Sequence, residues 1–280
     1  MEWLTANKIP VGKWAKSLVD WLTDNAAWFF DALSAGLEAA IDAILWLLQT
    51  PHPLIVIVLV TALAYVVRRS IGFAVFVGLG LLLIVNQGYW EETTETLALV
   101  LASSAVCMGL GVPLGIAAAR RPWLFSAMRP VLDLMQTIPT FVYLIPALIL
   151  FGLGMVPGLI ATVIFAIPAP IRLTHLGISS TPRDLLEAGE AFGATKRQLL
   201  WKIELPYAMP QIMAGLTQTI MLSLSMVVIA ALVGADGLGV PTLRALNQVN
   251  IAKGFEVGLA IVLIAIILDR LFRSSQEPGR

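Results

Sequence analysis

Residues 181–206 read TPRDLLEAGEAFGATKRQLLWKIELP, a charge-rich stretch that leads from one long apolar run into another. The flanking runs, Leu134–Ile171 and Leu205–Ala235, contain no Asp, Glu, Lys, Arg or His. A membrane-spanning helix needs about 20 predominantly apolar residues. Both runs reach that length, so we expect the charged stretch to be a loop outside the bilayer. The chain is therefore predicted to be an all-α, polytopic membrane protein.

The charged stretch carries its own helix signals. In residues 181–184 (TPRD), the Thr181 hydroxyl is expected to cap a helix, with proline at the first helical position and an acidic residue in the first turn. Gly193, Pro206 and Pro210 are expected to break the run into two short helices. A membrane protein that holds a rigid helical knob in the cytoplasm usually has a soluble partner docked on it.

Composition supports a membrane protein and excludes several functions. The chain is 58% hydrophobic and 13% charged, against about 25% charged in an average soluble domain. Its net charge of zero gives no reason to expect nucleic-acid binding. Cys107 is the only cysteine, so no intrachain disulfide can form, and His52 and His175 have no metal-ligand spacing around them. Charged residues interrupt the N-terminus early, so we expect no cleavable signal sequence.

Hydropathy predicts seven spans. Residues 134–171 are too long for one helix and are expected to fold as two spans joined by a turn at Gly152–Gly154 and Pro157-Gly158. The remaining expected spans are 54–67, 71–85, 96–119, 205–235 and 254–272. If the charged loop is cytoplasmic, alternation places most Lys and Arg residues inside, as the positive-inside rule requires. This arrangement predicts an N-terminus outside and a C-terminus in the cytoplasm.

The first fifty residues show a separate pattern. Six polar residues recur at spacings of four and seven and fall on one helical stripe: Asp20, Asp24, Asp31, Glu38, Asp42 and Gln49. Apolar residues cover the rest of the helix, so we expect it to lie at the membrane surface or to pack on the spans with its stripe facing water. It could also seat an extracytoplasmic partner, brace a dimer, or form an additional transmembrane helix.

The apolar runs lack the groups that intramembrane chemistry needs. No ionisable carboxylate, amine or imidazole occurs in residues 71–85, 96–119, 134–171 or 205–235. Proton-driven transporters and intramembrane hydrolases usually hold such groups at mid-membrane. The chain also has no phosphate-binding loop of the form GxxxxGK[ST]. We therefore expect no enzymatic activity on this chain and an energy source on a partner.

A few residues within the spans are candidates for a transport pathway or for gating. Pro139 and Pro146 interrupt helices and free backbone carbonyls, and Tyr143 lies between them. Ser223 and Ser225 give a polar face to the sixth span. The simpler interpretations are also open, namely plain kinks for the prolines and hydrogen bonds to neighbouring helices for the serines.

Seven positions at fixed spacing carry a resemblance to a known family. Glu187-Ala188-Gly189, then Gly193, then Ile203, Leu205 and Pro206 resemble the EAA loop of ABC-importer permeases, whose pattern is E-A-A-x-x-x-G-x(9)-I-x-L-P. The departure is Gly189, where the family usually has Ala; we expect the small residue to keep close approach to a partner. Residues 135–146, 223–230 and 267–270 further resemble the permeases of glycine betaine/proline betaine/choline importers. The resemblance covers about residues 93–272.

The resemblance implies a fold and a division of the chain. It implies a type I ABC importer transmembrane core over 93–273, with a cytoplasmic coupling loop at 178–207. Two extra short transmembrane helices (51–92) and a tail with the amphipathic interfacial helix (1–50) precede this core, and a cytoplasmic tail (274–280) follows it.

The resemblance also implies a function. The chain would be the permease subunit that moves a quaternary-amine compatible solute (glycine betaine, choline, proline betaine or trimethylamine N-oxide) across the bacterial inner membrane by alternating access. Two copies would form a homodimer with two ATP-binding cassette subunits and an extracytoplasmic solute-binding protein. Glu187, Ala188, Gly189, Gly193, Ile203, Leu205 and Pro206 would couple to the ATPase, which holds ATP and Mg, so no cofactor is expected on this chain. We assign no substrate-binding residues.

Two other classes of function remain alternatives. A self-contained secondary transporter or channel would move solute without an ATPase. A non-transporting osmosensory scaffold would bind partners and move nothing.

Overall fold

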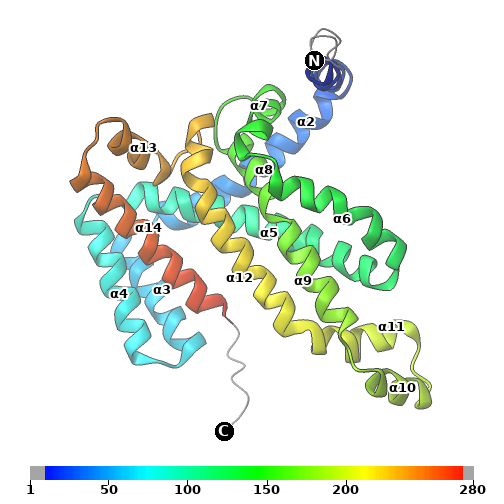
Figure 1. The fold of residues 1–280 in the computed structure, drawn as a ribbon. Coiled ribbons are helices and arrows are strands. Elements are labelled where there is room, and N and C mark those ends of the chain that lie inside the picture. The colour runs from blue at the N-terminus through cyan, green and yellow to red at the C-terminus, as the bar shows by residue number, and fades with distance from the viewer. Residues whose placement is uncertain (1–9, 274–280) are drawn as a thin grey trace.

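The computed structural model describes residues 10–273 and is all-helical over that range (Figure 1). The predicted tail 274–280 lies outside the described residues, as do residues 1–9. The elements are α2 Val11–Gln49, α3 Pro53–Arg68, α4 Ile71–Asn86, α5 Trp90–Arg120, α6 Pro122–Thr137, α7 Thr140–Phe151, α8 Met155–Ala166, α9 Pro168–Ser179, α10 Arg183–Ala191, α11 Lys196–Leu199, the π-helix η1 Leu200–Glu204, α12 Leu205–Ala230, the 3₁₀ turn η2 Ala231–Val233, α13 Gly239–Asn247 and α14 Ile251–Phe272.

Four helical stretches of the described chain are long and apolar enough to cross a membrane: Trp90–Arg120, Met155–Ser179, Lys196–Val233 and Ile251–Phe272. The number rises to six if two sharply bent pairs each count as one span, α2 with α3 (99°) and α6 with α7 (96°). The helix α4 is apolar but shorter. The predicted span at residues 54–67 is thus part of a bent pair with α2.

The run 134–171 is divided differently from the prediction. A turn does occupy residues 152–154, but the chain also breaks at Ile138 and Pro139, where α6 ends and α7 begins. Proline disfavours the helical conformation in the residue before it, and Ile138 is extended, with ψ of 130°. The prediction of a single break in this run was therefore wrong.

Three helices form the packed centre of the molecule, with α9 between α5 and α12 (Figure 1). Glycines permit this approach. A Cβ built on Gly115 of α5 would lie 2.6 Å from the Thr174 Cβ and 2.7 Å from the Ile171 carbonyl oxygen. On the α12 side, a Cβ on Gly215 would lie 3.2 Å from the Cα of Pro170. Small residues at helix contacts let backbones pack closely in membranes, where dispersion contacts drive association.

The helix α2 packs on the bundle through its second half only. It bends at Ala26, and beyond the bend Ile41 is buried and Phe30 meets Phe151 of α7 edge to face, with ring centroids 5.4 Å apart. Before the bend, Trp14 and Trp21 are exposed.

The six residues of the polar stripe of α2 are all exposed. At the end of the stripe, the Gln49 Nε2 donates to Thr94 Oγ1 of α5 at 2.9 Å. Glu38 and Asp42 line a pocket of about 370 Å³ together with Asp236, which precedes α13. The stripe therefore lies on the exposed side of α2, and Gln49 also links the end of α2 to α5. That the stripe faces water stays a prediction.

Candidate functional site

The charged stretch folds as a two-helix knob at one end of the molecule, formed by α10 and α11 (Figure 1). The helix α10 begins at Arg183, one residue later than predicted, and its N-cap is Pro182 with no side-chain cap. Thr181 is buried, and its Oγ1 has no hydrogen-bond partner among residues 10–273. The predicted Thr181 cap was therefore wrong, because Pro182 is extended (ψ of 136°) and separates the hydroxyl from the first turn. Asp184 does lie in the first turn, where it favours the helix dipole.

Gly193 provides the bend between the two helices of the knob. Its φ is +76°, in the left-handed region that favours glycine. The turn is closed by the Gly193 amide donating to the Glu190 carbonyl at 2.8 Å and the Ala194 amide donating to the Gly189 carbonyl at 3.0 Å. Thr195 then starts α11 with a capping box that includes Gln198. The knob thus has a fixed shape, set by one glycine and one capped helix start.

The chain does not break at Pro206 or Pro210, contrary to the prediction. The helix α11 continues through the π-helix η1 into α12, and both prolines lie within α12. Pro206 cannot donate a backbone hydrogen bond and its ring would crowd the carbonyl four residues earlier in an α-helix. The wider π turn, in which the Leu205 amide donates to the Leu200 carbonyl, lets the helix pass this point. The knob is therefore continuous with the span Lys196–Val233.

Gly189 packs inside the knob. A Cβ built on it would lie 2.6 Å from the Leu199 Cδ2 and 2.7 Å from the Ile203 Cδ1. The small residue therefore lets α10 approach α11 and η1 of its own chain. That Gly189 also allows close approach to a partner stays a prediction.

The outer surface of the knob combines charge with exposed apolar side chains. Glu187 and Ala188 are exposed, and the Glu187 carboxylate has no hydrogen-bond or ion-pair partner among residues 10–273. Phe192 is 93% exposed and Trp201 is 63% exposed. The motif did not include these two aromatic residues. An aromatic residue within a charged stretch that lies outside the membrane is the signal that could have found them. Large apolar groups on a polar surface mark interaction sites.

An ion pair ties the knob to α5. Arg120, the last residue of α5, donates through Nη2 to the Glu204 Oε2 at 2.8 Å and to the Lys196 carbonyl at 2.9 Å. The Glu204 side chain is only 15% exposed. The segment α11–η1 is therefore linked to α5 by these contacts, as well as to α12 by the continuous helix. Sequence reasoning missed this contact because its partners are 84 positions apart.

The candidate pathway residues are not all brought together. Pro139 is the N-cap of α7 and Pro146 lies inside it. Tyr143 packs with Phe165 on a small cluster between α7, α8 and α12. Ser223 is fully buried and hydrogen-bonds Ser103 of α5, with 3.1 Å between the hydroxyl oxygens. This contact favours the helix-to-helix interpretation of Ser223 over a place in a pathway.

Ser225 lies instead on an exposed polar stripe of α12. The stripe consists of Gln211, Ala214, Gln218, Met221 and Ser225, which recur at spacings of three and four. Neither glutamine amide has a hydrogen-bond partner among residues 10–273. Amides are costly to leave unsatisfied in hydrocarbon. The stripe therefore indicates a face that meets water or another protein chain.

The described residues thus form a bundle of helices, several of them long and apolar enough to cross a membrane, with a rigid two-helix knob at one end. This arrangement is that of a polytopic membrane protein with a surface for a partner. The comparisons with known proteins agree. Residues 111–277 match the family model of the binding-protein-dependent transport system inner membrane component. The chain belongs to this family.

Full-length relatives and a solved structure resemble the chain. It is 47% identical to the glycine betaine/carnitine transport permease protein GbuB of Listeria monocytogenes, over 97% of each chain. It is 46% identical to the glycine betaine transport system permease protein OpuAB of Bacillus subtilis, over 94% of this chain and 93% of that one. A structure of the inward-facing MetNI methionine ABC transporter superposes with a TM-score of 0.59 and 23% identity, over 66% of this chain and 94% of that chain.

The comparisons confirm the predicted class of protein. The chain is a multi-pass permease subunit of an ABC transporter, and ATP hydrolysis belongs to a separate subunit. The likeness to MetNI supports the type I importer fold.

Proposed function

We propose that this permease imports a quaternary-amine compatible solute of the glycine betaine type across the bacterial inner membrane. Relatives that match over nearly the whole chain are named for glycine betaine, carnitine or proline betaine transport. More distant relatives are named for trimethylamine N-oxide and for choline. Such solutes carry no net charge or a single positive charge, which suits spans without fixed charges.

The proposed assembly has two copies of the chain, two ATP-binding cassette subunits and an extracytoplasmic solute-binding protein. The polar stripe of α12 supports a second copy, because two such stripes facing one another would enclose a water-accessible pathway. The knob would dock on the ATPase, which carries ATP and Mg. With the knob in the cytoplasm, the N-terminus would lie outside and the C-terminus inside, as the positive-inside rule favours.

One observation carries the proposed mechanism, namely that the knob is helically continuous with α12. Closure of the ATPase on ATP would displace α10. Gly189 packs α10 on Leu199 and Ile203, so the displacement would pass to α11 and through η1 to α12. The ion pair between Arg120 and Glu204 would carry the same displacement to α5. The central helices would thereby alternate between outward and inward access.

The surface of the knob suggests which side chains would bind the ATPase. Glu187 offers an unpaired carboxylate to a cationic group, and Phe192 offers an exposed ring. Interface energy is concentrated in a few aromatic and charged anchors. We therefore expect Phe192 to fill an apolar pocket of the ATPase, with Glu187 setting the register.

The test replaces each anchor and measures both assembly and transport. Phe192→Ala and Glu187→Lys are expected to lower the affinity for the ATPase subunit about tenfold or more and to abolish ATP-driven uptake. Membrane insertion should be unchanged, because neither side chain is buried. The matched control is Phe255→Ala near the start of α14, where the ring is 80% exposed. The start of α14 lies beside α13, across the molecule from α10 and α11 (Figure 1).

ATPase affinity is measured by co-purification at graded subunit concentrations, and uptake is measured with radiolabelled glycine betaine. Normal affinity and uptake in both anchor variants would contradict the coupling role. Equal loss in the Phe255→Ala control would contradict the placement of the ATPase on the knob.

A further inference from the structure

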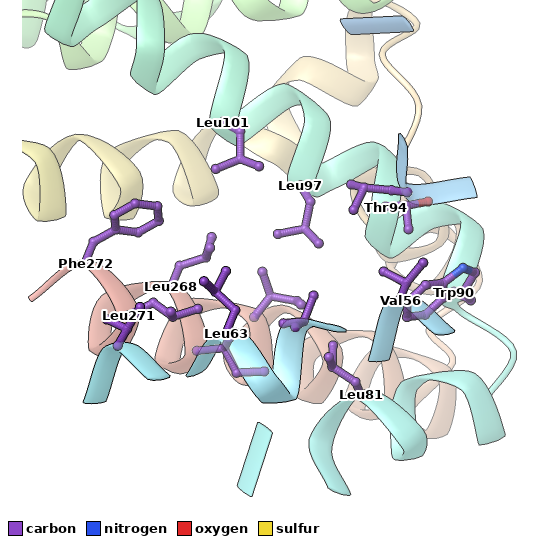
Figure 2. A pocket seen from close by; sticks show the side chains of 15 residues that line it. Val56, Leu63, Leu81, Trp90, Thr94, Leu97, Leu101, Leu268, Leu271 and Phe272 are labelled. Atoms are coloured by element: carbon purple, nitrogen blue, oxygen red, sulfur yellow. The ribbon is translucent and has the colours of Figure 1, made fainter. Parts of the chain in front are cut away.

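A carbon-lined pocket lies on the side of α5 that faces α3 and α14. It has a volume of about 450 Å³ and is enclosed by side chains of α2, α3, α4, α5 and α14. Figure 2 shows Leu268, Leu271 and Phe272 of α14 toward one end, Trp90 and Val56 toward the other, and Leu97 and Leu101 of α5 along one wall. The volume falls in the range of about 300–1,000 Å³ typical of ligand pockets.

The chemistry of the lining excludes a polar solute as the occupant. The polar groups among the 15 lining residues are the Thr94 hydroxyl and the Trp90 indole. The Thr94 hydroxyl is already satisfied, because it donates to the Glu91 carbonyl at 2.7 Å and accepts from Gln49. A quaternary amine would find neither a charge nor an aromatic cage here. A hydrocarbon chain would give the lining atoms the dispersion contacts that an unfilled space denies them.

The shape suits a chain that enters from the bilayer. The lining on α3 runs from Val56 to Val67, about 16 Å of helix at about 1.5 Å per residue. Leu63 and Val67 line the pocket and are still 54% and 44% exposed. The pocket is therefore open to hydrocarbon along one side.

Positive charge gathers at the end of the pocket that Val67 and Phe272 line. Arg68 and Arg69 follow Val67, and Arg270 and Arg273 flank Phe272. Arg68 Nη1 donates to the Arg273 carbonyl at 3.0 Å, which holds the ends of α3 and α14 together. Asp269 is the one carboxylate in residues 66–70 and 267–273. With four arginines against one aspartate, the C-terminal ends of α3 and α14 carry a net charge of +3.

We propose that this pocket is a binding site for an anionic phospholipid, with one acyl chain in the pocket and the phosphate headgroup on the arginines. Basic pockets between transmembrane helices on the cytoplasmic side bind anionic headgroups. The knob and the C-terminal ends of α3 and α14 lie on the same side of the molecule (Figure 1). In the orientation proposed above, the lipid belongs to the cytoplasmic leaflet. The bound lipid fills the space between the α3–α4 hairpin and α14, and it attaches the hairpin to the permease core.

The test counts lipids on the purified, delipidated full chain by native mass spectrometry. The probes are phosphatidylglycerol and phosphatidylcholine of identical acyl chains. We expect phosphatidylglycerol to bind the wild-type chain more tightly. The double variant Arg69→Gln/Arg270→Gln should weaken phosphatidylglycerol binding on the order of 25-fold, about fivefold for each arginine. The variant Arg69→Lys/Arg270→Lys, which keeps both positive charges, should bind phosphatidylglycerol as the wild-type chain does. This result would also show that both positions tolerate substitution.

Matched controls separate this site from general lipid contact. Leu63→Trp fills the pocket and should remove the tight phosphatidylglycerol, whereas Leu79→Trp on α4, exposed and outside the pocket, should not. The charge control is Arg129→Gln with Arg121→Gln, both exposed elsewhere on the chain.

Three results would overturn the proposal. The first is equal affinity of the wild-type chain for the two lipids. The second is unchanged phosphatidylglycerol binding in the Arg69→Gln/Arg270→Gln or Leu63→Trp variants. The third is a disulfide between two copies of a Leu63→Cys variant at full lipid content, which would show that a second chain covers the pocket.

Discussion

Two glycines of the knob have different physical roles. Gly193 is needed for its backbone conformation, with φ of +76° and nothing within 4 Å of the place where a Cβ would stand. Gly189 is needed for its size, because Leu199 and Ile203 occupy that place. The family motif shows that both positions are small, but only the structure shows which constraint applies to each.

The conformational role of Gly193 predicts a difference between two substitutions. Gly193→Val should strain the turn by about 1–2 kcal/mol and reduce ATP-driven uptake severely, because α10 would change its angle to α11. Gly193→Asn should retain most uptake, since asparagine tolerates the left-handed region. Uptake in proteoliposomes measures the difference, and equal activity of the two variants would contradict a conformational role.

The functional residues of the knob could be predicted from sequence only where local spacing reveals them. Glu187 and the bend at Gly193 follow from the motif. Arg120 could not be found because its partner Glu204 is brought near by the packing of α5 against α12, which follows η1 directly. The Thr181 cap failed because Pro182 took the N-cap position, which composition does not reveal.

At the scale of helices, the central feature is α9, held between the glycine faces of α5 and α12. Sequence predicted most of the apolar helices, because composition alone shows where a span can lie. It did not predict how the proline-containing segments would be joined. The break at Ile138 and the passage through Pro206 depend on an extended residue and a π turn, respectively, and both outcomes are compatible with an isolated proline.

The close contact of α5 with α9 predicts that alanine substitutions at two glycines of α5 have different effects on stability. Gly115→Ala should lower the free energy of unfolding by about 1–3 kcal/mol, because its Cβ would overlap Thr174 and the Ile171 carbonyl. Gly109→Ala should leave stability unchanged or raise it by up to about 1 kcal/mol, since nothing lies within 4 Å and alanine favours the helix. Thermal unfolding of the purified chain in detergent compares the two. A lower melting temperature for Gly109→Ala than for Gly115→Ala would contradict the packing described.

At the scale of the whole molecule, the proposed pathway depends on which face of α12 meets water. The polar stripe was not predicted as a unit, because Ser223 and Ser225 are two residues apart and only the packing separates them. Ser223 bonds Ser103 in the interior, whereas Ser225 lies on the exposed stripe.

This separation predicts different reactivity of two engineered thiols. Ser225→Cys should react with a water-soluble, cationic thiol reagent in the assembled transporter, and the reaction should block uptake. Ser223→Cys should not react, since thiolate chemistry needs water access. Cys107 is buried and gives little background. Labelling is followed by mass spectrometry, and preferential reaction at position 223 would contradict the proposed pathway.

The central claim is that a separate ATPase drives this transporter by docking on the knob formed by α10 and α11. The most direct measurement is uptake of radiolabelled glycine betaine by proteoliposomes that hold the permease with or without its ATPase and binding protein. We expect uptake only with all three components and ATP on the ATPase side, and none from the permease alone under a proton or sodium gradient. Gradient-driven uptake by the permease alone would contradict the account.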